Sequence, residues 1–187
     1  MLICRCLRIN SECGACLSKQ RKDRLKTESH VDSDRVFKRI LVAVDGSESS
    51  FRAARVAVRL AKRNEATLLV VSVIQTPAHA FMPTQTLTSP GMNIDGLQGY
   101  YKYATRDAQE WIDKVVSIAT PLGVKVRERV LKGATSVVRG LTDYASSQAI
   151  DLIVVGRKGS GGFKRLLLGS VSNGVVNHAA SSVLVVR

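Results

Sequence analysis

The chain has 187 residues and carries 28 Lys and Arg against 15 Asp and Glu, a formal net charge of +13 at pH 7. Hydrophobic residues make up 45% of it, which is enough for a substantial core and excludes a chain that is disordered throughout. The longest apolar runs fall short of the roughly 18–20 residues that a membrane span needs. No secretory signal is recognisable at the N-terminus, so we expect a cytoplasmic protein.

Residues 1–35 differ in composition from the rest of the chain. They are rich in Lys, Arg, Ser and Asp and lack helical periodicity, which predicts a disordered extension before a domain over residues 36–187. All the cysteines lie in this extension: Cys4, Cys6, Cys13 and Cys16. A reducing cytosol argues against disulfides. Two close pairs of thiolates suit zinc, although the spacing is not that of a standard knuckle, so a zinc site and a tail without metal both stay open.

Apolar runs and helical periodicities alternate along the domain. Short runs rich in β-branched residues, bounded by turn residues, predict strands over 39–44, 66–74, 124–131, 151–155 and 182–186. Apolar residues spaced three and four apart predict helices over 49–63, 100–118, 137–145 and 169–179. This order predicts a doubly wound α/β domain, in which a five-stranded parallel sheet has helices on both faces.

Local signals mark several boundaries within this pattern. Ser47 or Asp45 is expected to cap the first helix, and Pro121 with Gly123 to end the second. The Pro- and Gly-rich stretch 75–99 predicts a long loop at the ligand end of the second strand. Trp111, Tyr100 and Tyr103 lie on the apolar stripe of the second helix, which places them in the core.

Two loops follow predicted strands and carry residues that suit an anionic ligand. The first is 44–47, and the second is the Gly-rich stretch 156–165, which leads into Gly169-Ser170 at the start of the last helix. Ligands of open α/β sheets bind at the carboxyl ends of the strands, where the strand order reverses. Glycines expose backbone N–H groups and a helix N-terminus favours phosphate, so a phosphate cradle is one interpretation. The other is that the glycines only form a turn and Ser170 only caps a helix.

Two common phosphate-binding motifs are excluded by spacing. A P-loop needs Gly-Lys-Ser/Thr after four residues, but Gly161, Gly162 and Phe163 occupy those positions after Gly156. The dinucleotide fingerprint lacks its last glycine, because Lys164 stands there, and it belongs after the first strand of a domain. A dinucleotide-dependent dehydrogenase is therefore disfavoured.

The spacing Gly156-x2-Gly159-x9-Gly169-Ser170 resembles the nucleotide-binding signature of the universal stress protein family, in its ATP-binding branch. The opening 40–47, the stretch 163–172 and the closing strand 182–186 also resemble that family. The resemblance covers about residues 36–187. It implies an adenine-nucleotide-binding fold of the flavodoxin or Rossmann type, with ATP at the point where the strand order reverses.

Carried over by matching positions, the resemblance implies a set of ATP-binding residues. Ala43 and Asp45 would lie by the base and ribose, Val73 would line the adenine pocket, and Val155 and Gly156 would contact the ribose side. The phosphates would be held by Gly159, Gly169, Ser170, Val171 and Ser172. Asp45 would also reach a Mg²⁺ ion through water. Helix capping is the competing interpretation of Asp45.

The function that we predict is that of an ATP-binding stress-response regulator. No dedicated base for attack on a phosphate is visible, although slow ATP hydrolysis or autophosphorylation at Ser160 or Ser170 is the alternative. A basic nucleic-acid-associated protein is a third interpretation, which the low aromatic content disfavours. The resemblance also implies a homodimer formed through the last strand, whose edge is open to pairing.

Overall fold

The computed structural model describes residues 36–77, 94–158 and 168–187. Strands and helices alternate along them, as predicted. They are β1 (Arg39–Ala43), α2 (Glu48–Asn64), β2 (Thr67–Gln75), α3 (Ile94–Ala119), a 3₁₀ turn (Thr120–Leu122), β3 (Val126–Ala134), α4 (Val137–Ser147), β4 (Leu152–Gly156), α5 (Ser170–His178) and β5 (Ser182–Val186). Within these ranges, no helix combines the length and the hydrophobicity that crossing a membrane requires.

The five strands form one parallel sheet in the order β3-β2-β1-β4-β5. The chain winds outward from β1 to β3, returns to β4 beside β1, and continues outward to β5. The strand order therefore reverses between β1 and β4, where Ile40 lies opposite Leu152 and Val42 opposite Val154. This topology confirms the predicted doubly wound α/β fold.

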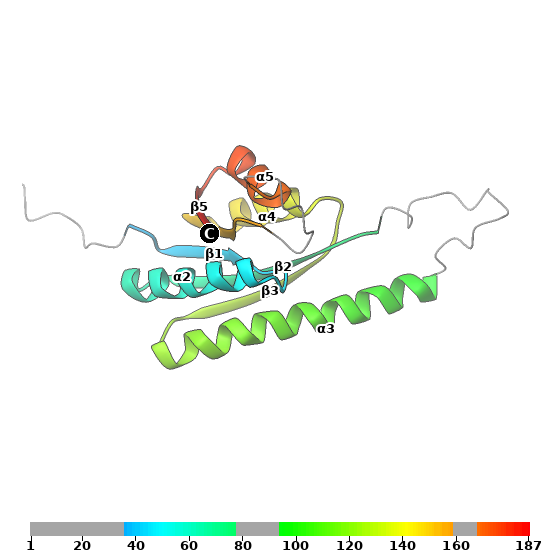
Figure 1. The fold of residues 1–187 in the computed structure, drawn as a ribbon, viewed down its shortest axis with the longest axis horizontal. Helices are drawn as coiled ribbons and strands as arrows, with labels where there is room; N and C mark the ends of the chain where they lie inside the picture. The colour runs from blue at the N-terminus through cyan, green and yellow to red at the C-terminus, as the bar shows by residue number, and fades with distance from the viewer. Residues whose placement is uncertain (1–35, 78–93, 159–167) are drawn as a thin grey trace, which may run out of the picture. The chain divides into compact units, whose positions relative to one another are not determined.

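Helices cover both faces of this sheet (Figure 1). Ile40 and Val42 belong to the core cluster beneath α2 and α3, whereas Leu41 between them belongs to the cluster beneath α4 and α5. All three side chains are fully buried. Burial on both faces explains why β1 is an unbroken apolar run and does not alternate with polar residues.

Capping chemistry sets the ends of the first two helices. Ser47, one of the two predicted caps, accepts a hydrogen bond from the backbone N–H of Ser50 at the start of α2. The last turn of α3 gives way to the 3₁₀ turn that contains Pro121, and Gly123 follows with a φ of 69°. That left-handed conformation suits glycine, so the predicted stop is confirmed.

The start of α3 corrects the predicted loop over 75–99. The helix already begins at Ile94, so residues 94–99 are helical, while 78–93 lie outside the described residues. Glycine costs about 1 kcal/mol in a helix relative to alanine, which 26 residues of packed amphipathic helix can offset. The glycines near the start of α3 were therefore misread as breakers.

The placement of Tyr100 and Tyr103 in the core was also wrong. Their side chains are 37% and 62% exposed. The Tyr100 hydroxyl donates to the carbonyl of Gln75, the last residue of β2. Trp111 is half-buried and packs against the α2–α3 side of the core, as predicted.

Candidate functional site

The loops after β1 and β4 lie next to each other, because these two strands are neighbours and parallel. Both loops leave the carboxyl edge of the sheet at the point where the strand order reverses. This is the position at which open α/β sheets bind ligands. The structure thus brings residues 44–47 of the first predicted loop and 156–158 of the second to the same edge of the sheet, while 159–165 lie outside the described residues.

Asp45 lies in a tightly hydrogen-bonded turn after β1. Its carboxylate oxygen Oδ1 accepts from the Ser47 hydroxyl at 2.6 Å and from the Ser47 backbone N–H at 3.1 Å. Gly46 between them has a φ of 78°, and a Cβ added there would lie 2.5 Å from the Trp111 ring. A side chain at this position would be strained and would clash with the indole. Trp111 therefore supports the turn that holds Asp45.

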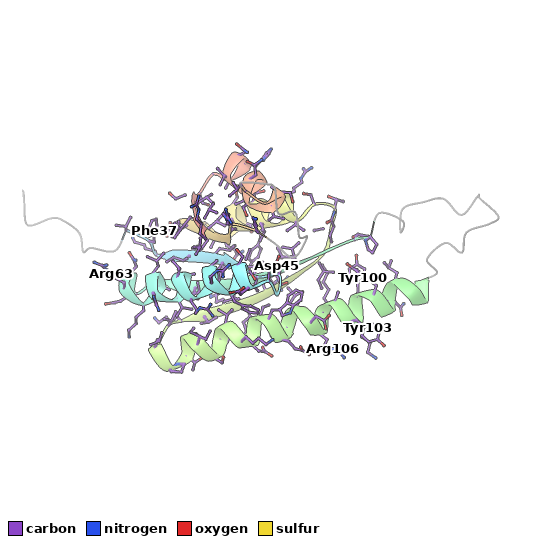
Figure 2. All side chains as sticks on the ribbon, in the orientation of Figure 1. Phe37, Asp45, Arg63, Tyr100, Tyr103 and Arg106 are labelled. Carbon is purple, nitrogen blue, oxygen red and sulfur yellow. The ribbon has the colours of Figure 1, made fainter. Side chains whose placement is uncertain are left out.

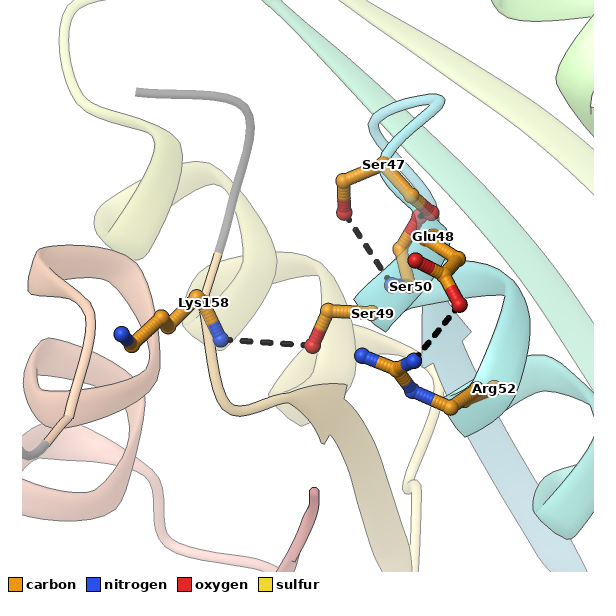
Figure 3. Close-up of polar contacts among 6 residues, drawn as sticks. All are labelled: Ser47, Glu48, Ser49, Ser50, Arg52 and Lys158. Carbon is orange, nitrogen blue, oxygen red and sulfur yellow. Dashed lines mark hydrogen bonds and ion pairs between the residues drawn. The ribbon is translucent and has the colours of Figure 1, made fainter. Parts of the chain in front are cut away.

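Serines at the start of α2 connect the β1 turn to the β4 loop (Figure 3). Ser47 caps the helix, and the Ser50 hydroxyl donates back to the Ser47 carbonyl at 2.8 Å. The Ser49 hydroxyl accepts from the Lys158 backbone N–H at 3.3 Å, across 109 positions of sequence. The first turn of α2 thus holds the two loops in register.

The close approach of β4 to α2 depends on Gly156. A Cβ on Gly156 would lie 2.7 Å from the carbonyl carbon, the carbonyl oxygen and the hydroxyl of Ser49. Real Cβ contacts are never this short, so only glycine fits without displacing α2. Sequence reasoning did not find Ser49, because no local signal links it to Gly156.

The start of α5 completes the arrangement. Its N-cap is Gly169, which offers no side-chain oxygen to the first N–H groups of the helix. The Gly169 N–H itself donates to the Arg157 carbonyl at 2.8 Å, which fixes the start of α5 beside the β4 loop. A helix N-terminus without a side-chain cap presents backbone donors and a positive dipole end, the features that favour an anion.

Ser172 has a structural contact that sequence reasoning did not predict. Its side chain is 3% exposed, and its hydroxyl donates to the Gly156 carbonyl at 2.6 Å. A serine hydroxyl has one proton, which this bond uses. Only the backbone N–H of Ser172 is left to donate to a phosphate, whereas Ser170 is exposed at the start of the helix.

Most of the predicted binding residues lie around this edge. Ala43 ends β1, and Val73, Val155 and Val171 belong with it to the core cluster beneath α4 and α5. Asp45 is in the β1 turn, Gly156 ends β4, and 169–172 start α5. Gly159 lies outside the described residues, as do Ser160, Lys164 and Arg165.

A separate cavity of about 200 Å³ lies at the opposite edge of the sheet. It is lined by Arg39, Thr67, Leu69, Arg127 and Gln148, which lie near the amino ends of β1, β2 and β3 or at the end of α4. Ligands of this topology bind at the carboxyl edge. We therefore assign the candidate site to the β1 and β4 loops.

The sheet order and the helix placement define an open α/β domain of the adenine nucleotide alpha hydrolase-like type. The model of the universal stress protein family matches residues 37–187. The chain therefore belongs to the universal stress protein family. A universal stress protein of Methanocaldococcus jannaschii is 30% identical over 159 residues, which cover 83% of this chain and 85% of the relative.

Solved structures agree with this assignment. The universal stress protein UspA from Lactobacillus plantarum is 25% identical, covers 80% of this chain and 97% of its own, and gives a TM-score of 0.68. A universal stress protein in complex with cAMP is 26% identical, with coverage of 81% and 97% and a TM-score of 0.52. An Arabidopsis thaliana family protein with AMP bound is 17% identical, with coverage of 80% and 90% and a TM-score of 0.54, and supports the fold alone. Structural relatives thus bind adenine nucleotides.

Proposed function

We propose that this protein binds ATP with Mg²⁺ between the β1 turn and the start of α5, and that it acts as a nucleotide-dependent regulator of the stress response. The observation that carries the proposal is the junction at the carboxyl edge. There, direct hydrogen bonds join the turn of Asp45, the β4 loop and an α5 N-terminus without a side-chain cap. The cAMP and AMP complexes of relatives support an adenine nucleotide as the ligand.

The donors and surfaces of this junction match the parts of ATP. The backbone N–H groups at the start of α5 suit phosphate oxygens. Ala43 and Val73, both half-buried on the α4 side of the sheet, supply an apolar surface of the kind that an adenine ring contacts.

Mg²⁺ would be held jointly by the protein and the phosphates. Among the described residues, no group of three or more His, Cys, Asp or Glu side chains is placed to hold a metal ion. Mg²⁺ commonly takes one or two carboxylates plus phosphates and water, and Asp45 supplies a carboxylate at this edge. Asp45→Asn keeps an oxygen for the two Ser47 donors but removes the charge, so it should abolish the Mg²⁺ dependence of ATP binding while preserving the fold.

The first test is calorimetric titration of Mg²⁺–ATP into nucleotide-stripped protein and its Gly169→Asp variant. Gly169 has φ −65° and ψ 156°, which aspartate adopts readily. Its carboxylate would cap α5 and occupy the donors that a phosphate needs, so the helix should persist while binding is lost. Gly169→Ala is the control, because it adds a Cβ without charge or capping oxygen and should bind better than the aspartate variant. Absence of heat with the wild-type protein, or equal binding by the aspartate variant, would refute the proposal.

We also propose a homodimer formed through β5, which is an edge strand of the sheet. Val183 to Val186 are only half-buried along this edge. The Ser182 N–H donates to the backbone carbonyl of Asp151, and the Val186 carbonyl accepts from the backbone N–H of Arg157. The backbone N–H and C=O groups of every second residue from Ser182 to Val186 therefore face β4. By this alternation, the N–H of Val185 faces the open edge.

The alternation yields a matched pair of proline variants. Val185→Pro removes a donor on the open edge, so it should give folded monomers by light scattering. Leu184→Pro removes a donor that faces β4, so it should destabilise the domain itself. A dimer that survives Val185→Pro unchanged would exclude pairing through β5.

A further inference from the structure

We infer that the solvent face of α2 binds the phosphodiester backbone of a double-stranded nucleic acid. The face consists of a basic row of five exposed side chains on consecutive turns of the helix. They are Arg52, Arg55, Arg59, Lys62 and Arg63. From Arg52 to Arg63 the row spans about 16 Å at 1.5 Å per residue. Figure 2 labels Asp45 before the start of α2 and Arg63 at its far end.

Most of the basic row lacks neutralising partners. Glu48 pairs with Arg52 at 2.7 Å, but none of Arg55, Arg59, Lys62 and Arg63 forms an ion pair with a carboxylate in the part of the chain that the structure describes. Like charges at i,i+4 oppose helix formation, and the row contains two such pairs of arginines. Outside α2, Arg106 pairs with Glu110 and Arg139 with Asp143, whereas other exposed cations of the described residues, such as Lys102 and Lys132, form no ion pair either. The row is distinguished by its density, because its five exposed cations lie within 12 residues of one helix in which Glu48 is the sole carboxylate.

Further cations continue the row beyond the end of α2. Lys38 and Lys125 lie beside the start of β2, because the Thr67 N–H donates to the Lys38 carbonyl and the Leu68 N–H donates to the Lys125 carbonyl. Lys62 Nζ lies 3.8 Å from where a Cβ on Gly123 would stand, which places the end of the row over the turn that leads into β3. Lys38 and Lys125 are both exposed. Positive side chains thus continue from α2 to the amino edge of the sheet, where exposed Glu65 and the Asp151 carboxylate, which accepts from the Lys38 and Arg39 N–H groups, offset part of their charge.

Charge complementarity indicates which kind of partner binds the basic row. A second copy of the same row would repel it, and residues 1–35 are themselves basic, with 8 Lys and Arg against 5 Asp and Glu. A membrane-surface helix presents Trp, Phe or Leu beside its cations, and a protein interface has aromatic or apolar anchors. The apolar residues of α2 instead pack on the core.

A double-stranded nucleic acid is the partner whose chemistry matches the basic row. Four of the five side chains are arginine, whose planar guanidinium pairs with phosphate oxygens through two hydrogen bonds. A duplex presents about ten phosphates over about 16 Å of its axis, which is more than enough to match five cations. The row has no aromatic side chain on which the bases of a single strand would stack, so it suits a paired backbone read without sequence preference. The low aromatic content that disfavoured nucleic acid at the sequence level thus argues only against single strands.

The test is the salt dependence of binding to a fluorescein-labelled 24-base-pair duplex, as DNA and as RNA, followed by fluorescence anisotropy. If all five cations contact phosphates, log K should fall with log salt with a slope of about −4.5, which is about a 500-fold loss between 50 and 200 mM. The triple variant Arg55→Ala/Arg59→Ala/Arg63→Ala should bind more weakly at 50 mM, with a slope of about −2 and about a 12-fold loss over the same range. Alanine is the best helix former, so α2 should stay folded, which circular dichroism checks.

A control with the same net charge separates the row from the overall field. Lys102→Ala/Arg129→Ala/Lys132→Ala removes three exposed cations from α3 and β3, and it should keep the wild-type slope within about one unit. Equal losses in both triple variants would overturn the inference, as would an undetectable affinity of the wild-type protein at 50 mM salt. Binding to vesicles with 30% phosphatidylserine is measured in the same way. If the α2 triple variant loses vesicle binding while its duplex binding is unchanged, the inference is also overturned. Calorimetry with Mg²⁺–ATP should be unchanged in the α2 variant, so this inference and the proposed nucleotide site fail independently.

Discussion

Replacing Gly156 by alanine tests the junction between β4 and α2. The added Cβ would lie 2.7 Å from three atoms of Ser49, two of which belong to the backbone. Carbon atoms in contact are separated by about 3.5–4.0 Å, so the first turn of α2 would have to move by about 1 Å. Overpacking of this kind costs about 1–3 kcal/mol. The displacement would also break the 3.3 Å hydrogen bond from the Lys158 N–H to Ser49, worth about 1 kcal/mol.

We therefore expect Gly156→Ala to lower the free energy of unfolding by about 2–4 kcal/mol. For a domain of this size the loss corresponds to a fall in Tm of about 4–16 °C, at about 2–4 °C per kcal/mol. Urea denaturation followed by circular dichroism measures it, with an unchanged m-value as the sign that the folded state is retained. Adding Ser49→Gly should recover only part of the loss, because it removes the hydroxyl but leaves the two backbone atoms in place.

Gly99→Ala is the matched control. It makes the same chemical change in α3, where an added Cβ would meet nothing within 4 Å. Alanine in a helix is preferred over glycine by about 1 kcal/mol, so this variant should be stabilised. A loss of less than about 0.5 kcal/mol in Gly156→Ala, comparable to an ordinary surface substitution, would refute the argument that glycine is required at the end of β4.

Two further substitutions test α2 and α5. Arg59→Glu replaces two like-charge i,i+4 pairs by two opposite-charge pairs. It should therefore stabilise the domain by about 1 kcal/mol in urea denaturation and weaken duplex binding. A loss of stability would contradict repulsion between Arg59 and its neighbours on the helix. Ser172→Ala removes the donor to the Gly156 carbonyl from a buried position, which should cost about 1–3 kcal/mol. Ser170→Ala, two residues earlier and at an exposed position, should change stability by less than about 0.5 kcal/mol, and equal effects of the two substitutions would contradict a structural role for the Ser172 hydroxyl.

The sequence was sufficient for the fold because its signals are local. An unbroken apolar run such as 40–44 identifies a strand buried on both faces, and the alternation of such runs with amphipathic helices allows few topologies. The same reasoning failed at the start of α3, because glycine lowers helix propensity by only a small amount. Packing along the sheet offset that amount, which composition alone does not reveal.

The candidate site was only partly predictable, because its contacts join distant positions. Strand-end loops could be placed on one edge from topology alone, and this put Asp45 and Gly169 near each other. The contact of Gly156 with Ser49 and the support of Gly46 by Trp111 depend on how α2 and α3 pack, and no pattern in either segment signals them. The hydrogen bond from the Ser172 hydroxyl to the Gly156 carbonyl was not predictable for the same reason, since it joins positions on either side of the second loop.

The distribution of charged residues over the structure carries information that the net charge alone does not. The arginines of α2 are exposed on the side away from its apolar face, yet a net charge of +13 alone does not distinguish a solvated surface from a binding surface. The positions of the carboxylates distinguish the two kinds of surface. On α3 and α4 they pair with the arginines, as Asp143 does with Arg139, whereas the solvent face of α2 offers only Glu48 at its first position. Because unpaired like charges destabilise the helix that carries them, their concentration there argues for a polyanionic partner that compensates for the cost.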